Sequence, residues 1–319
     1  MVILANASPS IGTGHVMRAL SVAEEFMKQG WQIDFAGKVE GVPWLSKYIK
    51  QIIPNITFES FKNLDLDHKE DFLLIDSYDL SVTDPFIQKE NWKKILAIVE
   101  DFTPPVFADF YFHPGSTCSW TPPLNYHNYQ YLEGIEFISV RESIREISFN
   151  RFSNPTKFPK IVIVGGGSDP FKFAPNLVNL LLQTKLEFSA DVFSTEIINS
   201  SNDRRFQFFQ LGQSFEDSIK TAELILCTSG TVSWEMLSAG FPIGIALATR
   251  NQELNYNYQH SFNLAVKIGE NTENGKWKFF EKNITNLIMD EDFRCAISEN
   301  AKSAHIGFGS KLIFELVKS

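Results

Sequence analysis

Residues 8–18 contain glycines, a histidine and an arginine at a spacing that could hold an anion and move a proton. The segment reads SPSIGTGHVMR, with Gly12 and Gly14 on either side of a threonine. Glycines let backbone N–H groups approach a ligand closely, and a helix that follows presents its positive dipole end. This arrangement suits a diphosphate. Because the spacing is neither GxGxxG nor that of a Walker A motif, it indicates neither a nicotinamide cofactor nor NTP hydrolysis.

His15 directly follows the second glycine of this loop. An imidazole at the start of a helix could face the mouth of a cleft and take a proton near neutral pH. The alternative is that His15 caps the helix or packs against its neighbours. The motif alone leaves both interpretations open.

Two later loops could approach a nucleotide. Residues 165–169 read GGGSD, which suits either a tight turn or a backbone close to a ligand. Residues 228–235 read TSGTVSWE, and small hydroxyl residues at a helix start can donate to phosphate oxygens. Glu235 could then accept from a ribose hydroxyl, although a capped helix with an acidic first turn is the common alternative. Asn251 and Gln252 could be ligands or an ordinary loop.

Carboxylates follow two apolar runs of the first half. Asp76 and Tyr78 lie at the end of DFLLIDSY, and Glu100 and Asp101 follow ILAIV. Active sites of α/β proteins gather at the carboxyl ends of parallel strands, so these groups could position a sugar or assist a proton transfer. Helix capping is the alternative. The remaining histidines show no metal-ligand spacing, and no GxSxG or nucleophilic cysteine context is present, so the sequence predicts a site without a metal.

The elements that would position these residues alternate as in an α/β protein. Residues 2–5 predict a buried strand, residues 15–29 a helix that ends at Gly30, and residues 31–36 a second strand. Further strands are predicted at residues 71–76 and 95–99. We expect parallel strands joined by right-handed crossovers.

A second strand–glycine–helix unit begins at residue 160. It comprises a strand at 160–164, a helix at 172–184, strands at 190–194, 224–227 and 243–247, and a helix that ends near residue 239. The sequence therefore predicts an α/β fold of two Rossmann-like domains facing a cleft that holds the ligand. The predicted domains are residues 1–152 and 158–319, joined by a linker at residues 153–157.

Composition narrows the function further. The 319 residues are 44% hydrophobic and 21% charged with a net charge of −9, which favours a globular protein and disfavours a nucleic-acid partner. The 3 cysteines are too far apart for a zinc site or a disulfide framework. The first residues do not form a signal peptide, and no apolar run is long enough to span a membrane. We expect a cytoplasmic protein; the sequence does not indicate its oligomeric state.

With these residues identified, the chain resembles the UDP-2,4-diacetamido-2,4,6-trideoxy-β-L-altropyranose hydrolases of pseudaminic acid synthesis. The resemblance rests on six blocks in order along most of the chain, with a glycine-containing tail, GFGS, in addition. The blocks are SPSIGTGHVMRAL, LLIDSYDLS, EDF, FISVRESI, IVIVGGGSDP and CTSGTVSWEMLSAGFPIGIALATRNQ. It implies a GT-B-like fold with the sugar nucleotide in the cleft.

The resemblance also implies roles for individual residues. His15 would activate water for attack on the anomeric carbon, with inversion and release of UDP, and without a metal or cofactor. The residues it implies in substrate binding are Asn6, Gly12, Gly14, Arg18, Asp76, Tyr78, Asn251 and Gln252. Those it implies in nucleotide binding are Gly166, Ser168, Ser229, Gly230, Thr231 and Glu235.

Three positions depart from the pattern of that family. Leu4 and Asn6 stand where relatives usually have Arg and Asp, and Ser77 stands where some have His. The departures put the identity of the sugar in question and could mean a different UDP- or CMP-linked substrate or weakened catalysis. They motivate one alternative function, a sugar-nucleotide binder without turnover. A second alternative is a GT-B glycosyltransferase, which would share the fold and the nucleotide loops but pass the sugar to an acceptor instead of water. A MurG-like transferase would carry a basic, apolar face for membrane docking, which this acidic sequence lacks.

Overall fold

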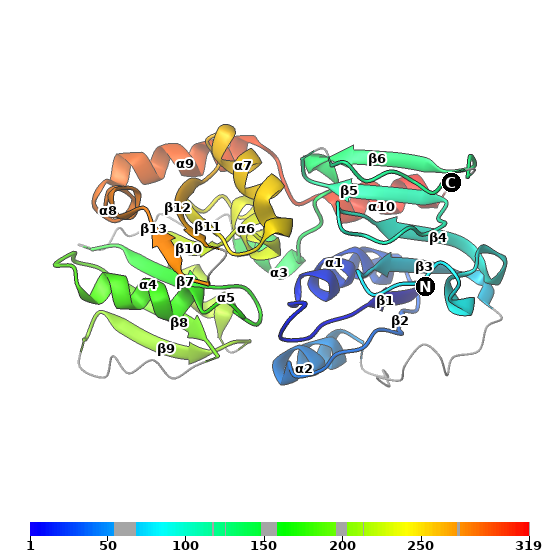
Figure 1. The fold of residues 1–319 in the computed structure, drawn as a ribbon, viewed down its shortest axis with the longest axis horizontal. Helices are drawn as coiled ribbons and strands as arrows, with labels where there is room; N and C mark the ends of the chain where they lie inside the picture. Colours follow the sequence, from blue (N-terminus) through cyan, green and yellow to red (C-terminus); the bar gives the residue numbers. More distant parts are fainter. Residues whose placement is uncertain are drawn as a thin grey trace. The chain divides into compact units, whose positions relative to one another are not determined.

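The protein comprises two compact α/β units (Figure 1). The computed structural model describes residues 1–53, 68–116, 118–124, 126–147, 158–195, 203–212, 214–272 and 275–318. Unit 1 is Met1–Arg141 together with Gly307–Ser319, and unit 2 is Glu142–Ile306. The predicted linker at residues 153–157 lies outside the described residues.

Unit 1 is built on a parallel sheet with the strand order β2-β1-β3-β4-β5-β6. Its strands are β1 (Val2–Ala5), β2 (Asp34–Phe35), β3 (His68–Asp76), β4 (Trp92–Ile98), β5 (Phe110–Pro114) and β6 (Gln130–Gly134). Its helices are α1 (Gly14–Lys28), α2 (Pro43–Ile52) and α10 (Gly309–Val317), with 3₁₀ turns η2 (Pro85–Ile87), η3 (Lys89–Asn91) and η4 (Ile135–Phe137). The strands predicted at residues 2–5, 71–76 and 95–99 are confirmed, with no end more than three residues from the predicted one.

Helix α1 forms because its apolar residues recur every three or four positions. Val16, Leu20, Ala23 and Phe26 are fully buried and share a core with β1 and β3. Burial of one such stripe, rather than helix propensity, supplies most of the stability of an amphipathic helix. The packing of α1 fixes its first turn, and with it His15, relative to the sheet.

The second predicted strand is shorter than expected. Residues 31–36 were predicted to be extended, but β2 pairs with β1 only through Asp34 and Phe35. Trp31 instead packs against the end of α1: its backbone N–H donates to the Phe26 carbonyl, and the centroids of the two aromatic rings lie 5.4 Å apart. The partly buried Trp31 therefore packs beside α1, and the strand begins further along the chain.

The end of the chain departs from the predicted domain division. Residues 158–319 were assigned to one domain, but α10 packs in unit 1, where its Phe314 ring lies 5.0 Å from that of Phe26. The Lys94 ammonium of β4 also donates to the Val317 carbonyl at 2.7 Å. The boundary on the N-terminal side lies at residue 141 rather than 152. The apolar face of α10 completes the core over α1, which accounts for the return of the chain.

Unit 2 is built on a seven-stranded sheet with the order β13-β12-β11-β10-β7-β8-β9, parallel except for β13. Its strands are β7 (Lys160–Val164), β8 (Ser189–Ser194), β9 (Phe206–Gln210), β10 (Leu224–Thr228), β11 (Ile243–Leu247), β12 (Val266–Asn271) and β13 (Trp277–Phe279). Its helices are α3 (Glu142–Arg145), α4 (Phe173–Leu182), α5 (Phe215–Lys220), α6 (Thr231–Ser238), α7 (Glu253–Ser261), α8 (Glu281–Met289) and α9 (Glu291–Ser303), and the 3₁₀ turn η6 (Arg250–Gln252) follows β11.

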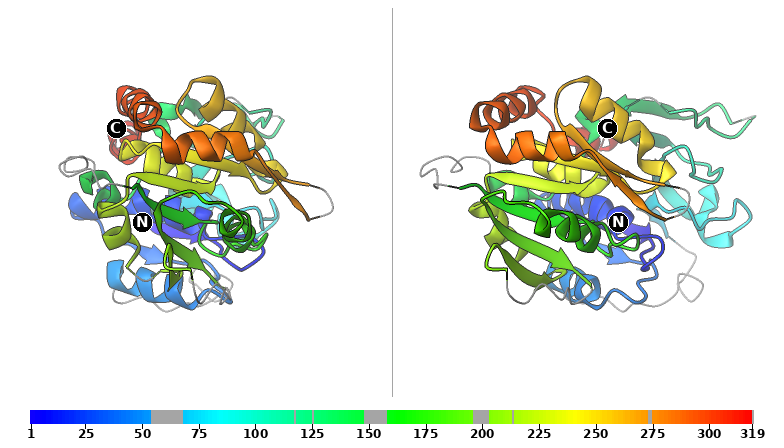
Figure 2. Two further views of the ribbon diagram at one scale, coloured as in Figure 1. Left: turned by 90° about the vertical axis from the view of Figure 1, so that its left-hand side faces the viewer. Right: turned by 60° about the vertical axis from the view of Figure 1, so that its left-hand side comes forward.

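Helices cover the central strands of unit 2, as the continuous apolar strand sequences require. Helices α4 and α8 share one core cluster with β7, β8 and β10, and Figure 2 shows both along one side of the sheet. Helices α6 and α7 contact β10, β11 and β12. A parallel sheet buried in this way matches the predicted Rossmann-like architecture. Among the described residues, no helix combines the length and the apolar character that a membrane span requires.

Candidate active site

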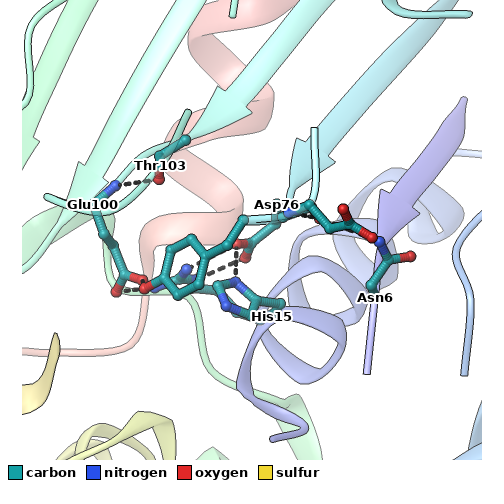
Figure 3. Close-up of polar contacts among 9 residues, drawn as sticks. Asn6, His15, Asp76, Glu100 and Thr103 are labelled. Carbon is teal, nitrogen blue, oxygen red and sulfur yellow. Dashed lines mark hydrogen bonds and ion pairs between the residues drawn. The ribbon is translucent and has the colours of Figure 1, made fainter. Parts of the chain in front are cut away.

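The carboxyl ends of β1, β3 and β4 in unit 1 bring the predicted site residues together. Asn6 follows β1, Asp76 ends β3, and Glu100 lies two residues beyond β4. The register pairs Ala5 with Asp76, so these ends meet at one edge of the sheet. His15 joins them from the first turn of α1 (Figure 3).

His15 and Asp76 form a buried pair. Nδ1 of His15 lies 2.6 Å from Oδ1 of Asp76, and the two residues are only 6% and 1% exposed. Since an ionised carboxylate can only accept, Nδ1 carries the proton in the neutral ring and Nε2 keeps its lone pair. Within the part of the chain that the structure describes, Nε2 has no hydrogen-bond partner. The ring is therefore oriented to accept a proton at Nε2.

Arg18 holds this pair from one turn further along α1. Its Nε and Nη2 donate to the two Asp76 oxygens at 2.7 and 2.8 Å, and Nη1 donates to Oε1 of Glu100 at 2.8 Å. Burial opposes the charge, but the Asp76 and Glu100 carboxylates outweigh it and raise the pKa of Arg18 well above its ordinary value. The guanidinium is engaged by the two carboxylates, and the predicted contact of Arg18 with the substrate stays a prediction.

Glu100 is the second carboxylate of the cluster. Its Oε2 accepts from the Tyr78 hydroxyl at 2.5 Å, and its backbone N–H donates to the Thr103 hydroxyl at 2.8 Å. Burial disfavours the ionised form, but the Arg18 charge and hydrogen bond prevail and lower the pKa of Glu100 to about 2. Glu100 is thus ionised throughout the physiological pH range.

These groups set the charge that His15 faces. Asp76 and Glu100 contribute two negative charges and Arg18 one positive charge, so these three side chains carry one net negative charge. A proton on His15 would bring the cluster to zero. This balance disfavours binding of a phosphate at the cluster, because a further anion would meet net negative charge.

Asn6 and Asp76 were predicted to contact the substrate, and the structure gives both side chains other partners. The Asn6 oxygen accepts from the Lys38 backbone N–H at 2.8 Å, and its amide donates to the Ser77 hydroxyl at 3.3 Å. These contacts tie the ends of β1 and β3 to the segment after β2. Asp76 is engaged by His15 and Arg18, so it orients the histidine.

The glycine loop before α1 has the geometry that its sequence suggests. Gly12 has φ +87°, a conformation that residues with a Cβ rarely adopt. Its N–H donates to the Ser8 carbonyl at 2.8 Å, which closes a tight turn, and α1 begins at Gly14. Contact of Gly12 and Gly14 with a substrate stays a prediction.

In unit 2, two of the predicted nucleotide loops lie beside one another. Gly166 follows β7 with φ +89°, and a Cβ there would lie 3.8 Å from the Thr228 hydroxyl at the end of β10. Ser168 is buried, and the Asp169 carboxylate accepts from two backbone N–H groups at the start of α4. The turn that the sequence allowed is therefore present, and it places Gly166 next to the second loop.

The second loop leads into the N-terminus of α6. Gly230 precedes the helix in an extended conformation, and the fully buried Ser229 hydroxyl has no hydrogen-bond partner among the described residues. Thr231 begins the helix and is half-buried, and Glu235 is 4% exposed. A helix N-terminus with small hydroxyl residues suits an anionic group.

Asn251 and Gln252 lie in η6, which follows β11. Gln252 accepts from the Ala248 N–H at 3.2 Å, and its amide nitrogen would lie 3.3 Å from a Cβ at Gly230. Gln252 is therefore adjacent to the α6 loop. Asn251 is exposed and accepts from the Thr249 hydroxyl. Both remain predicted ligands.

The sequence interpretation did not assign three residues of the unit 1 cluster. Glu100 was considered only as a carboxylate that could position a sugar, assist a proton transfer or cap a helix; His113 was considered only as a metal ligand and set aside, and Thr103 was not considered. His113 lies in β5, is 5% exposed, and its Nδ1 has no partner within the described residues. Burial lowers the pKa of His113. The position of His113 near the end of a strand is the sequence feature that could have indicated a place near the site. No group of three or more metal-ligating side chains is found in the part of the chain that the structure covers.

Comparison with known proteins identifies the architecture. No family model and no curated protein matches the sequence. Solved structures match over nearly the whole chain: MurG of Acinetobacter baumannii has 14% identity and a TM-score of 0.61 over 99% of both chains. The fold is GT-B. The UDP-GlcNAc 2-epimerase of Neisseria meningitidis, solved with UDP-GlcNAc, has 12% identity and a TM-score of 0.58 over 100% of both chains. Arabidopsis thaliana UGT89C1, solved with UDP-L-rhamnose, has 13% identity and a TM-score of 0.58 over 99% of this chain and 98% of its own.

Proposed function

We propose that the protein hydrolyses a UDP-linked 2,4-diacetamido-2,4,6-trideoxyhexose, with His15 as the general base. The observation that carries this proposal is the His15–Asp76 pair, with Nδ1 bound to a carboxylate and Nε2 open to accept a proton. A positioned histidine of this kind accelerates proton transfer by about 10²–10⁴-fold. The sequence resemblance supplies the sugar, and the nucleotide-bound GT-B structures support UDP as the leaving group.

In the proposed step, Nε2 of His15 takes a proton from water as the water oxygen attacks the anomeric carbon. The bond from that carbon to the diphosphate oxygen breaks, and UDP leaves with the bonding electron pair. Attack from the opposite face inverts the anomeric configuration. The charge that His15 gains is balanced by the net negative cluster of Asp76, Glu100 and Arg18.

Unit 2 would hold the nucleotide in this proposal. The N–H groups and hydroxyls at the start of α6 suit the diphosphate, and Gly166 leaves room for the nucleotide beside that helix. Glu235 would accept from the ribose hydroxyls. The predicted roles of Ser168, Ser229, Gly230, Thr231, Asn251 and Gln252 belong to this part of the proposal.

A GT-B glycosyltransferase is the second candidate, because MurG has the same fold over the full chain. The same imidazole could deprotonate an acceptor hydroxyl instead of water. The two reactions differ only in the nucleophile, so the assay must identify the group that receives the sugar.

The direct test is product analysis in H₂¹⁸O with UDP-2,4-diacetamido-2,4,6-trideoxy-β-L-altropyranose, EDTA and no acceptor. The proposal predicts equal amounts of UDP and free sugar, with the label in the sugar because the carbon–oxygen bond breaks. Label in the released nucleotide would contradict attack at the anomeric carbon. UDP release only after addition of an acceptor would establish a transferase. UDP binding without any release would point to another sugar, a missing acceptor or a binder without turnover.

A further inference from the structure

Five side chains of unit 1 form a closed ring of contacts that includes His15. Asp76 accepts from His15 and from Arg18, and Arg18 donates to Glu100. Glu100 accepts from the Tyr78 hydroxyl, and the Tyr78 ring packs edge-on against the His15 ring with centroids 4.3 Å apart. This closed set of contacts restrains His15 in two places: at Nδ1 through Asp76, and at its imidazole ring through Tyr78 (Figure 3).

Glu100 closes this ring without touching His15 itself. One of its oxygens holds Arg18 and the other holds Tyr78. We propose that Glu100 is a positioning residue that orients His15 through Arg18 and Tyr78, and that its charge interacts with the charge of His15. The expected effect of Glu100 on kcat rests on the proposed function, whereas its electrostatic effect on His15 does not.

The backbone of Glu100 is itself firmly placed. Its N–H donates to the Thr103 hydroxyl at 2.8 Å, and its carbonyl accepts from the Thr103 N–H at 2.9 Å. The Thr103 carbonyl accepts from the buried Trp120 indole at 2.8 Å. Because the turn is tied to the core, the Glu100 carboxylate can transmit a fixed geometry to its two partners.

The charges around His15 come from four elements of unit 1. Those that face the cluster are Asp76 and Tyr78 at the end of β3, Arg18 on α1, Glu100 after β4 and His113 on β5. Burial opposes ionisation of Glu100, while the charges of Arg18 and then of His15 help to keep its pKa at about 2. The interaction between two charges is mutual, so removal of the Glu100 charge acts on His15 as well.

The test that needs no substrate is titration of the histidine side chains by NMR in the full-length protein. Glu100→Gln keeps the side-chain shape but removes the charge, so the titration midpoint of His15 should fall by about 0.5–1 pH unit. Glu90→Gln makes the same charge change at an exposed site before β4 and should leave the midpoint in place. The His15 signals are assigned from their loss in His15→Gln. An unchanged midpoint in Glu100→Gln would overturn the electrostatic part of the proposal.

Glu100→Asp separates charge from position and provides a second variant if Glu100→Gln does not fold. It retains the charge but shortens the side chain by one methylene. The His15 midpoint should stay within about 0.2 pH unit of the wild type, because the charge remains. kcat should still fall about tenfold with KM within about twofold, because Arg18 and Tyr78 lose their common anchor. Wild-type kcat in Glu100→Asp would overturn the positioning role.

A double-mutant cycle distinguishes this role from a general loss of packing. Tyr78→Phe removes only the hydroxyl that donates to Glu100 and keeps the ring against His15. If Tyr78 acts through Glu100, the double variant Tyr78→Phe/Glu100→Gln should have the same kcat as Glu100→Gln alone. Losses that multiply would contradict this coupling. If the wild type releases no UDP, the proposed function fails, whereas the histidine titration still decides the inference about Glu100.

Discussion

At the scale of single residues, the buried charge cluster of unit 1 makes stability depend on pH. Burial alone would raise the pKa of Glu100, but the charge and hydrogen bond of Arg18 lower it from 4.5 to about 2. A lowered carboxylate pKa stabilises the folded state above the unfolded-state value, and that stabilisation is lost as pH falls through the folded-state value. The relevant window is therefore between pH 4.5 and about 2.

Glu100→Gln should accordingly lower the free energy of unfolding by about 1–3 kcal/mol at pH 7. The difference from the wild type should shrink as the pH falls through this window, because wild-type Glu100 then also becomes neutral. Urea denaturation at a series of pH values measures it, with Glu90→Gln as the control for an exposed carboxylate. A difference that stays constant down to pH 2 would contradict the assigned pKa shift.

The type of residue at the site was predictable, but its partners were not. His15 after a glycine loop, and Asp76 at a strand end, could be identified from local sequence. Their pairing depends on the register of β1 with β3 and on the rotation of α1, which long-range packing sets. For the same reason the contacts of Arg18 and Asn6 within unit 1 were not predicted; their predicted contacts with the substrate stay predictions.

At the scale of elements, the strands and helices with strong apolar patterns were predicted well. The predicted strands at residues 160–164, 190–194 and 243–247 agree with β7, β8 and β11 to within one residue. The location of α10 was not predictable, because an amphipathic helix shows which face it buries and not against which unit. Its core partners are distant in sequence.

Phe314 tests the assignment of α10 to unit 1. The side chain is 6% exposed and contacts Phe26, so Phe314→Ala should cost about 3–5 kcal/mol and lower the midpoint of urea unfolding. Phe308→Ala, at the start of the same helix, is the matched control because Phe308 is 53% exposed. Equal effects of the two substitutions would contradict a core role for α10.

At the scale of the whole molecule, the proposal divides the work between the two units. Unit 1 carries the proton-transfer residues, and unit 2 carries the loops suited to a nucleotide. Two Rossmann-like domains were predicted from the repeated strand–glycine–helix pattern, and the GT-B arrangement was implied by the family resemblance; this fold class is confirmed, although the predicted domain limits differ from the two units. The local sequence pattern indicates how many sheets the chain forms, whereas the domain boundaries depend on where the ends of the chain pack.

UDP affinity tests the role of unit 2 separately from turnover. Glu235→Gln keeps the side-chain shape but weakens acceptance from the ribose hydroxyls, so UDP should bind about tenfold more weakly by calorimetry. Glu253→Gln, an exposed carboxylate of α7, should leave the affinity unchanged. Unchanged UDP affinity in Glu235→Gln would return Glu235 to a structural role in α6.

The central claim is that Nε2 of His15 accepts the proton of the attacking water. The most direct measurement compares UDP release by the wild type, His15→Gln and Glu90→Gln, with UDP affinity measured on the same preparations. The account predicts that His15→Gln loses at least about 10²-fold in kcat while its UDP affinity stays within about threefold, and that Glu90→Gln changes neither. If His15→Gln retained more than about a tenth of the wild-type kcat, His15 would not be the general base.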